Sequence, residues 1–317
     1  MLVPTLTSDP KLGTSLGITG GYIHQFDPES QQSMFIARAS YSDTDSRVAG
    51  LFGQIFFDSD RQKVILGLVD GNIENDYDDF LGSGIPVQTT DDLDAEFARY
   101  YHLVTGDWYA GVQLVSTNYT IGADGMLDFV LDFISLTGFD STGLGLVAEY
   151  DTRDNARNPS KGRQFEFNNF AYRESLGGDE SFDVYQSKYS EYLDFKKDHI
   201  LAWQVKGRWT DNAPIGGYSS IQLRGYVRGN YLAPHYTHFQ IEDRISINST
   251  WGMSVFGGLA CLYDKLSDCG ESGNLYASIG SGVIYTLKQE AGVVIRAELA
   301  KGESDEATFY LGLGNSF

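Results

Sequence analysis

The chain has few prolines and no long apolar run. It holds 7 Pro in 317 residues, and no stretch of eighteen consecutive apolar residues occurs in it. A membrane-spanning helix needs about 20 predominantly apolar residues. The sequence therefore excludes a helical membrane protein.

Common catalytic patterns are also missing. The sequence has no Gly-x-Ser-x-Gly elbow, no His-Glu-x-x-His zinc motif, no phosphate-binding glycine loop and no Cys/His metal spacing. His235 and His238 lie three residues apart, a spacing that places them on opposite faces of a strand. An omptin-like or lipase-like barrel enzyme would need a base beside paired acids such as Asp78 and Asp79, which have none nearby in the sequence. We expect no catalytic residue, no metal and no cofactor.

Positive charge is scarce. The 23 Lys and Arg face 43 Asp and Glu, which gives a formal net charge of -20. A surface of this sign repels nucleic acid, so a nucleic-acid partner is excluded. The acidic clusters at 70–79 and 91–96 are interpreted as solvated loops. Divalent cations bridging them to anionic lipid are the alternative, although the clusters have no EF-hand spacing.

Glycine and aromatic residues are abundant, with 36 Gly, 20 Tyr and 19 Phe. The chain ends in a segment whose apolar side chains at 309, 311, 313 and 317 alternate with small or polar ones. This period of two is typical of a strand with one apolar face. Lipid-facing and lumen-facing residues alternate in this way in transmembrane barrels, whose interfaces carry aromatic girdles. The sequence predicts an all-β fold, a transmembrane antiparallel β-barrel.

The alternation predicts about sixteen strands, an even number that brings both termini to the periplasm. The weakest is 126–136, which could instead be a helix in a loop. We expect a long loop, 211–235, to fold into the lumen. The predicted strands are 14–25, 33–42, 47–58, 62–72, 96–105, 107–118, 126–136, 143–151, 163–175, 181–193, 200–210, 238–248, 253–263, 275–287, 291–301 and 307–317.

We predict a single barrel domain over 1–317, with 1–13 as a short lead-in. The start Met1-Leu2-Val3-Pro4 has neither the basic residues nor the apolar core of a signal peptide, which is typical of a mature form with an added Met. Further amino-terminal domains could have been removed from such a form.

Four elements in order resemble the BamA/TamA superfamily of outer-membrane assembly and secretion barrels, also called the bacterial surface antigen family. They cover about 143–317. The elements are the Asp151-Thr152-Arg153-Asp154-Asn155 segment with Pro159 and Gly162 after it, the loop motif Arg224-Gly225-Tyr226, the Glu242-Asp243-Arg244 strand, and the terminal Leu311-Gly312-Leu313-Gly314 with the last aromatic Phe317.

The resemblance implies that Arg224 pins the loop inside the barrel by pairing with a luminal carboxylate. Members of the family carry that carboxylate on the strand after the Glu-x-Arg strand, where this chain has Gly258. We therefore expect Glu242 to be the partner, with Arg244 beside it on the luminal face. Gly225 permits the tight backbone, and Tyr226 supplies a contact to the wall.

The closing strand carries the assembly signal that the resemblance implies. Asn315 stands where the family has a second hydrophobic residue, so recognition would depend on Leu311, Leu313 and Phe317. Gly312 and Gly314 offer few side chains for packing, which favours a seam between first and last strands that opens readily.

Two cysteines lie eight residues apart, Cys261 and Cys269. An external loop that passes through an oxidising periplasm could hold them as a disulfide. Two unconnected thiols are the alternative.

We expect a non-catalytic protein in the outer membrane of a Gram-negative-type bacterium. Proteins that insert or translocate polypeptides, or lipid, are the first functional hypothesis. A passive diffusion channel or a structural surface antigen is the alternative. The expected partners are outer-membrane lipid and lipopolysaccharide, the barrel-assembly machinery during biogenesis, and client polypeptides, with the protein a monomer or homodimer. The family's periplasmic POTRA domains do not occur in this sequence, which resembles a short branch without them or a barrel excised from a longer chain.

Overall fold

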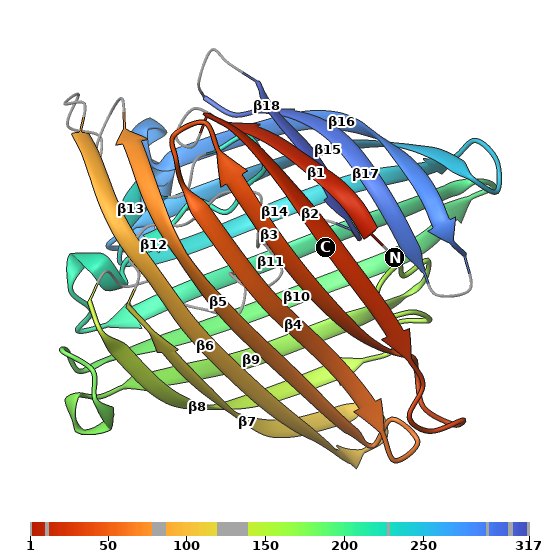
Figure 1. Ribbon diagram of the computed structural model, residues 1–317, viewed down its shortest axis with the longest axis horizontal. Helices are drawn as coiled ribbons and strands as arrows, with labels where there is room; N and C mark the ends of the chain where they lie inside the picture. The colour runs from red at the N-terminus through yellow and green to blue at the C-terminus, as the bar shows by residue number, and fades with distance from the viewer. Residues whose placement is uncertain are drawn as a thin grey trace.

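The computed structural model describes residues 2–9, 13–77, 87–118, 139–226, 229–289, 292–303 and 307–315. Sixteen strands form one closed antiparallel barrel (Figure 1). They are β1 (Leu2–Asp9), β2 (Gly13–His24), β3 (Ser33–Ser42), β4 (Arg47–Phe57), β5 (Gln62–Tyr77), β6 (Val87–Thr105), β7 (Trp108–Thr117), β8 (Ser141–Asp151), β9 (Gly162–Tyr172), β10 (Phe182–Lys196), β11 (His199–Asp211), β14 (His235–Ser246), β15 (Trp251–Tyr263), β16 (Leu275–Lys288), β17 (Val293–Lys301) and β18 (Thr308–Leu313).

The barrel has the inverted polarity of a membrane protein, as β14 illustrates. Glu242 and Arg244 are buried, whereas Phe239 and Ile241, whose side chains point to the opposite face of the strand, are exposed. Apolar side chains therefore face outward and polar ones inward, which suits a strand between lipid and lumen. The predicted fold class is confirmed. In the described part of the chain no helix has both the length and the apolar character required to cross a bilayer.

The connections differ in length between the two ends of the barrel. At the end where β1 begins and β18 finishes they run from two residues (106–107) to ten (152–161), and we call it the short-turn end. At the opposite, long-loop end, the segments between β7 and β8 (118–140) and between β11 and β14 (212–234) each have 23 residues. Aromatic pairs mark the short-turn rim, with Trp108 and Tyr150 ring centroids 5.2 Å apart and Trp251 and Tyr285 at 4.8 Å.

The expected lead-in over 1–13 is wrong, because Leu2–Asp9 forms β1, with Val3 and Thr5 buried on its luminal face. Pro4 hides the strand signal, since proline is tolerated only where no partner needs its missing N–H. Here the pairs that the described residues of β1 form with β18 are at Thr7 and Ser8, so Pro4 lies outside that ladder. The predicted strand 126–136 lies outside the described residues.

The luminal wall is not uniformly polar. A cluster of buried apolar side chains covers the luminal face from β3 to β10 and includes Ile36, Phe52, Ile65, Val147 and Phe170. A second cluster joins the inserted segment to β14–β16 through Leu223, Tyr226, Tyr236, Ala260 and Tyr276. Buried charged residues such as Lys63, Arg99 and Glu149 lie on the same strands as the first cluster.

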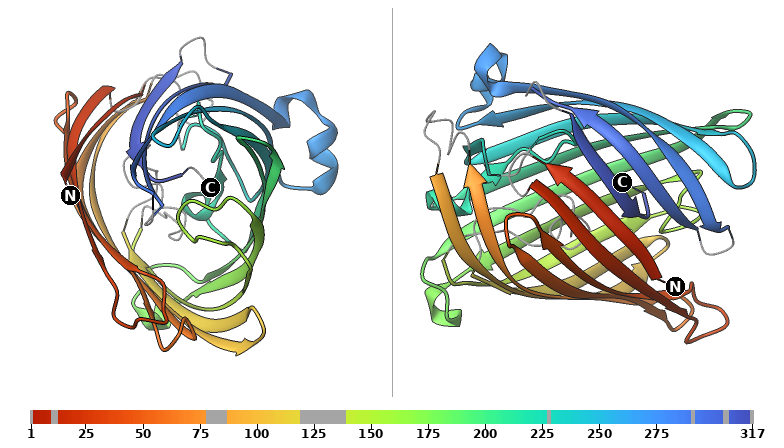
Figure 2. Two further views of the ribbon diagram at one scale, coloured as in Figure 1. Left: turned by 90° about the vertical axis from the view of Figure 1, so that its right-hand side faces the viewer. Right: turned by 45° about the horizontal axis from the view of Figure 1, so that its top comes forward.

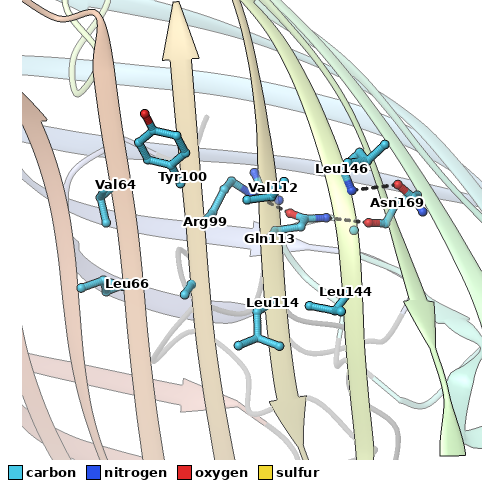
Figure 3. A pocket seen from close by; sticks show the side chains of 12 residues that line it. Val64, Leu66, Arg99, Tyr100, Val112, Gln113, Leu114, Leu144, Leu146 and Asn169 are labelled. Carbon is cyan, nitrogen blue, oxygen red and sulfur yellow. Dashed lines mark hydrogen bonds between the residues drawn. The ribbon is translucent and has the colours of Figure 1, made fainter. Parts of the chain in front are cut away.

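One wall interface has an interrupted ladder. The β8–β9 pairs run from Leu144 with Ala171 to Val147 with Asn168, and the two positions between them have no ladder partner, although the register is the same on both sides. Side chains occupy the gap (Figure 3): the Leu146 N–H donates to Asn169 Oδ1 at 3.0 Å, and Gln113 Nε2 donates to the Asn169 carbonyl at 2.8 Å. Gly145 is needed for this arrangement. A Cβ built on it would lie 1.6 Å from the Asn169 carbonyl oxygen, the atom that accepts the hydrogen bond from Gln113.

Candidate functional site: the luminal segment and the barrel seam

The segment between β11 and β14 enters the lumen, as its position inside the ring of strands shows (Figure 2, left). It contains a two-stranded sheet of β12 (Ser219–Ser220) and β13 (Leu232–Ala233) and a 3-10 turn, η3 (Ile215–Gly217). Ile221 and Leu223 are almost fully buried in it. Burial of these side chains fixes the segment against the wall of the barrel.

Arg224 projects from this segment onto two carboxylates. Its Nη2 lies 2.9 Å from Glu242 Oε2 and its Nη1 lies 3.0 Å from Glu298 Oε1. The structure thus contains the predicted pair with Glu242 and adds Glu298 on β17, which the sequence analysis does not name as a partner. The guanidinium also lies 3.3 Å from the ring centroid of Phe256, a cation-π contact.

Two further arginines complete a charged cluster. Arg244 Nε lies 2.8 Å from Glu242 Oε1, and Arg296 Nη2 lies 2.9 Å from the same oxygen and also contacts Glu298. Glu242 is fully buried. A buried carboxylate with several charge-assisted hydrogen bonds is strongly coupled to its partners, and removing one side leaves uncompensated charge. The cluster therefore ties β14 and β17 to the luminal segment.

Gly225 and Tyr226 contact the wall on either side of the cluster. Gly225 adopts φ +91°, and a Cβ there would lie 2.7 Å from the Gly302 nitrogen. Its N–H donates to Tyr310 Oη at 3.0 Å, so the segment reaches the closing strand β18. Tyr226 Oη donates to the Ala277 carbonyl at 2.7 Å, and burial, reinforced by Glu303, raises the pKa of Tyr226 to about 12.

Gly258 leaves room for the inserted segment. A Cβ at this position would lie 2.9 Å from Leu223 Cδ2 and 3.0 Å from the Phe239 carbonyl. No carboxylate would fit without moving Leu223. The absence of the acidic residue that the family carries there therefore coincides with an apolar contact, and Arg224 turns to Glu242 and Glu298 instead.

The seam of the barrel lies between β1 and β18. Among the described residues, two pairs form across it, Thr7 with Tyr310 and Ser8 with Phe309, whereas β1 pairs with β2 at eight positions from Leu2 to Asp9. The seam predicted between 14–25 and 307–317 is therefore wrong in its first strand. Among the residues that the structure describes, no heavy atom lies within 4 Å of a Cβ built on Gly312, and the ladder partners of Leu311 and Leu313 belong to β17. Phe317 lies outside the described residues.

The turn between β8 and β9 carries the element with Asp151, Arg153, Asp154, Pro159 and Gly162 that resembles the family. Arg153 binds Asp151 with two hydrogen bonds, Nε to Oδ1 at 2.9 Å and Nη2 to Oδ2 at 2.7 Å. Pro159 is buried, and Gly162 begins β9 with φ +99°. Partial burial raises the pKa of Asp154, but hydrogen bonds from Ser160 and from the Lys161 N–H outweigh it and the net pKa is lowered.

Asn315 joins this turn to the charged cluster. Its Nδ2 donates to the Arg157 carbonyl at 3.0 Å and to Asn158 Oδ1 at 2.7 Å, and its Oδ1 accepts from Arg296 Nη1 at 3.1 Å. Sequence reasoning treated Asn315 only as a departure from a hydrophobic signal. Its amide instead connects the end of the chain to the 152–161 turn, a contact between residues more than 150 positions apart.

Cys261 and Cys269 form a disulfide with a Cα–Cα distance of 5.7 Å. Cys261 lies at the end of β15, and Cys269 lies in the 3-10 turn η4 (Leu266–Gly270) of the following connection at the long-loop end. Among the described residues no group of three or more His, Cys, Asp or Glu side chains is placed to hold a metal ion. His238 lies buried on the luminal face of β14, with its ring between Tyr236 and Gln204.

Residues 118–317 match the family model of the Omp85 superfamily domain. The chain belongs to the Omp85 superfamily. It is an outer-membrane β-barrel protein of a Gram-negative-type bacterium. A comparison with curated proteins gives no match.

Solved Omp85 barrels share the fold. BamA from Haemophilus ducreyi lacking POTRA domains 1-3 is 12% identical with a TM-score of 0.57, and the match covers 99% of this chain and 70% of that one. CdiB from Acinetobacter baumannii is 9% identical with a TM-score of 0.64, covering 99% of this chain and 59% of that one. CdiB from Escherichia coli is 10% identical with a TM-score of 0.64, and the match covers 99% of this chain and 62% of that one. This chain thus spans less than two thirds of either CdiB.

Proposed function

We propose that this Omp85 barrel inserts or translocates polypeptides at the outer membrane through the β1–β18 seam. The observation that supports the proposal is the short ladder, which in the described ranges joins Thr7 and Ser8 of β1 to β18. Residues Leu2–Leu6 pair with β2 on one side alone. Backbone groups without partners are costly in a bilayer, and an edge strand accepts another strand by β-augmentation.

The luminal segment supports the same proposal because it contacts the closing strand. Gly225 donates to Tyr310, whose own backbone forms one of the two seam pairs. Movement of the Arg224 cluster would therefore reach β18 directly. We propose that Arg224, Gly225 and Tyr226, with Glu242 and Arg244, hold the closing strand in place, and that Leu311, Gly312, Leu313, Gly314 and Phe317 serve both as assembly signal and as seam.

The substrate would be an unfolded outer-membrane or secreted polypeptide, with lipid or lipopolysaccharide beside the seam. The 151–162 element, with Asp151, Arg153, Asp154, Pro159 and Gly162, would shape the periplasmic entrance at the short-turn end. No step of this proposal requires a catalytic residue or cofactor.

A disulfide across the seam tests the function. Continuing the register of Thr7 with Tyr310 places Thr5 opposite Gly312, so Thr5→Cys with Gly312→Cys locks the edge. The matched control is Ser190→Cys with Gln204→Cys, a luminal pair in the complete β10–β11 ladder. Both are made without the native cysteines and reconstituted in liposomes.

The measurement is the folding of a urea-unfolded eight-stranded barrel, followed by its heat-modifiable gel shift. We expect the oxidised seam lock to slow assisted folding to the rate of empty liposomes and reduction to restore it, with the control pair unaffected. Equal assistance by locked and reduced protein would contradict the proposal and favour a passive channel or structural surface antigen.

A further inference from the structure

A cavity of about 240 Å³ lies inside the barrel near the short-turn end. Residues of β3–β6, β8–β10 and β17 line it, together with the 152–161 turn and Asn315. Its two walls differ in character. One wall is apolar, an uncommon feature in the polar lumen of an outer-membrane barrel, and consists of Met34, Ile36, Phe52, Phe56 and Ile65.

The opposite wall carries carboxylates that already have cationic partners. Lys63 Nζ lies 2.9 Å from Glu149, Arg153 Nη2 lies 2.7 Å from Asp151, and Arg99 Nη1 lies 2.8 Å from Glu166. Three acids are thus matched by three cations. None of them needs a cation from a ligand.

Lys188 is the additional positive charge. It lies on β10 between the buried luminal residues Gln186 and Ser190, and it lines the cavity. Within the described part of the chain its ammonium forms no ion pair. Glu166, opposite it in the β9–β10 ladder, attracts it electrostatically but forms its ion pair with Arg99. The nearby Arg157 also lines the cavity and donates to the Gln32 carbonyl at 2.7 Å. A surplus of positive charge here is notable because the whole chain has a net charge of -20.

We infer that this cavity binds a single-chain anionic amphiphile, with its carboxylate or phosphate head on Lys188 and its acyl chain along the apolar wall. Charge complementarity selects the anion, because each acid of the cavity already forms an ion pair with another cation and Lys188 adds one further positive charge. The apolar wall selects an alkyl chain. The volume lies just below the range of about 300–1,000 Å³ typical of small-molecule pockets, which favours one short chain over a two-chain lipid.

Native mass spectrometry of the full chain in a non-ionic detergent tests the inference. The probes are dodecanoate, dodecyl phosphate, uncharged dodecanol and inorganic phosphate. We expect one equivalent of either anionic amphiphile, and at least tenfold weaker binding of dodecanol and of phosphate. The ratio between dodecanoate and dodecyl phosphate distinguishes a fatty acid from a lysophospholipid-like head group.

Two variants locate the site. Lys188→Met keeps the length of the side chain and removes the charge, and should weaken dodecanoate binding at least tenfold. Lys265→Met removes an exposed lysine from the loop after β15 and should leave binding unchanged. A heat-modifiability gel checks that each variant is folded.

Unchanged dodecanoate binding by folded Lys188→Met, or equal binding of dodecanol and dodecanoate, overturns the inference. If Lys188→Met fails to fold, Ile65→Ser, which shortens the apolar wall, replaces it. Retention of full dodecanoate binding by this second variant overturns the inference as well.

Discussion

The seam and the wall opposite to it both lack part of the backbone ladder, but they are completed differently. Eight barrel strands (β1–β8) lie on one side of the β8–β9 gap and eight (β9–β11 and β14–β18) on the other, so this gap faces the seam across the barrel. At the gap, Asn169 and Gln113 replace the missing backbone bonds, and the register continues unchanged. At the seam, two residue pairs form, and β18 is held from inside through Tyr310.

The difference shows that an incomplete ladder does not by itself make a barrel wall open. Side-chain hydrogen bonds between neighbouring strands keep the β8–β9 wall closed, because opening it would leave the bonded polar groups without partners in hydrocarbon. On the luminal side, the support for β18 comes instead from the inserted segment, through the hydrogen bond from the Gly225 N–H to Tyr310. The charged cluster on that segment is therefore expected to control the seam and to have little influence on the opposite wall.

The largest loss of stability should follow from Glu242→Gln. Three arginines contact this carboxylate, and loss of a buried partner leaves uncompensated charge that costs about 3–5 kcal/mol. The midpoint of urea unfolding in lipid vesicles should fall accordingly, and spin labels on β1 and β18 should report a broader range of distances.

The adjacent outward residue supplies the control for that experiment. Asp243 contacts His199 at 2.9 Å with both side chains partly exposed, and an exposed pair contributes about 0–1 kcal/mol. Asp243→Asn should therefore shift the midpoint little. Similar shifts in the two variants would show that the cluster does not support the seam.

A smaller loss of stability is expected from Arg224→Ala. Glu242 and Glu298 keep Arg296, so the cost is that of the charge-assisted hydrogen bonds lost, about 2–3 kcal/mol. The 212–234 segment should become sensitive to protease added from the long-loop side. Arg224→Lys retains the charge without the two-pronged geometry and should lie between wild type and Arg224→Ala. Protease resistance equal to that of wild type in Arg224→Ala would count against the role of this contact.

The opposite wall should respond locally to Asn169→Val. The Leu146 N–H loses its acceptor, and the expected cost is about 1 kcal/mol. Hydrogen exchange of the Leu146 amide should accelerate, while distances across the seam should not change. Ala171→Val, at a paired position on the same face of β9, is the matched control. An unchanged Leu146 exchange rate would mean that Asn169 does not replace the ladder.

The smallest expected effect is the loss of stability of the 152–161 turn at low pH. The folded pKa of Asp154 is below its ordinary value of 3.8. Its contribution to stability is therefore present above about pH 4 and is lost as pH falls through the lowered folded value. Exchange of the Ser160 amide, corrected for intrinsic rates, should stay protected at pH 4 and lose protection only below it. Asp154→Asn should remove this pH step, and loss of protection already near pH 5 in wild type would contradict the assignment.

Much of this architecture was predictable because a barrel strand repeats every two residues. The alternation in 238–248 and 291–301 is enough to place Glu242, Arg244, Arg296 and Glu298 on the luminal face, and the BamA/TamA-like motifs point to Arg224 as the partner of Glu242. Strand β1 was not predicted because Pro4 interrupts its signal. Pro4 lies opposite Ile18 of β2, at a position where β18 forms no pair with β1.

Sequence periodicity alone determined which face of each strand meets lipid and which meets the lumen, since that choice depends only on the parity of the residue number along the strand. The tertiary structure decided which luminal groups meet. Arg224 reaches Glu298 across 74 positions and Asn315 reaches Arg157 across 158. Closure of the barrel sets these contacts, because it brings β17, β18 and the β8–β9 turn around one lumen whose interior distances no local pattern encodes.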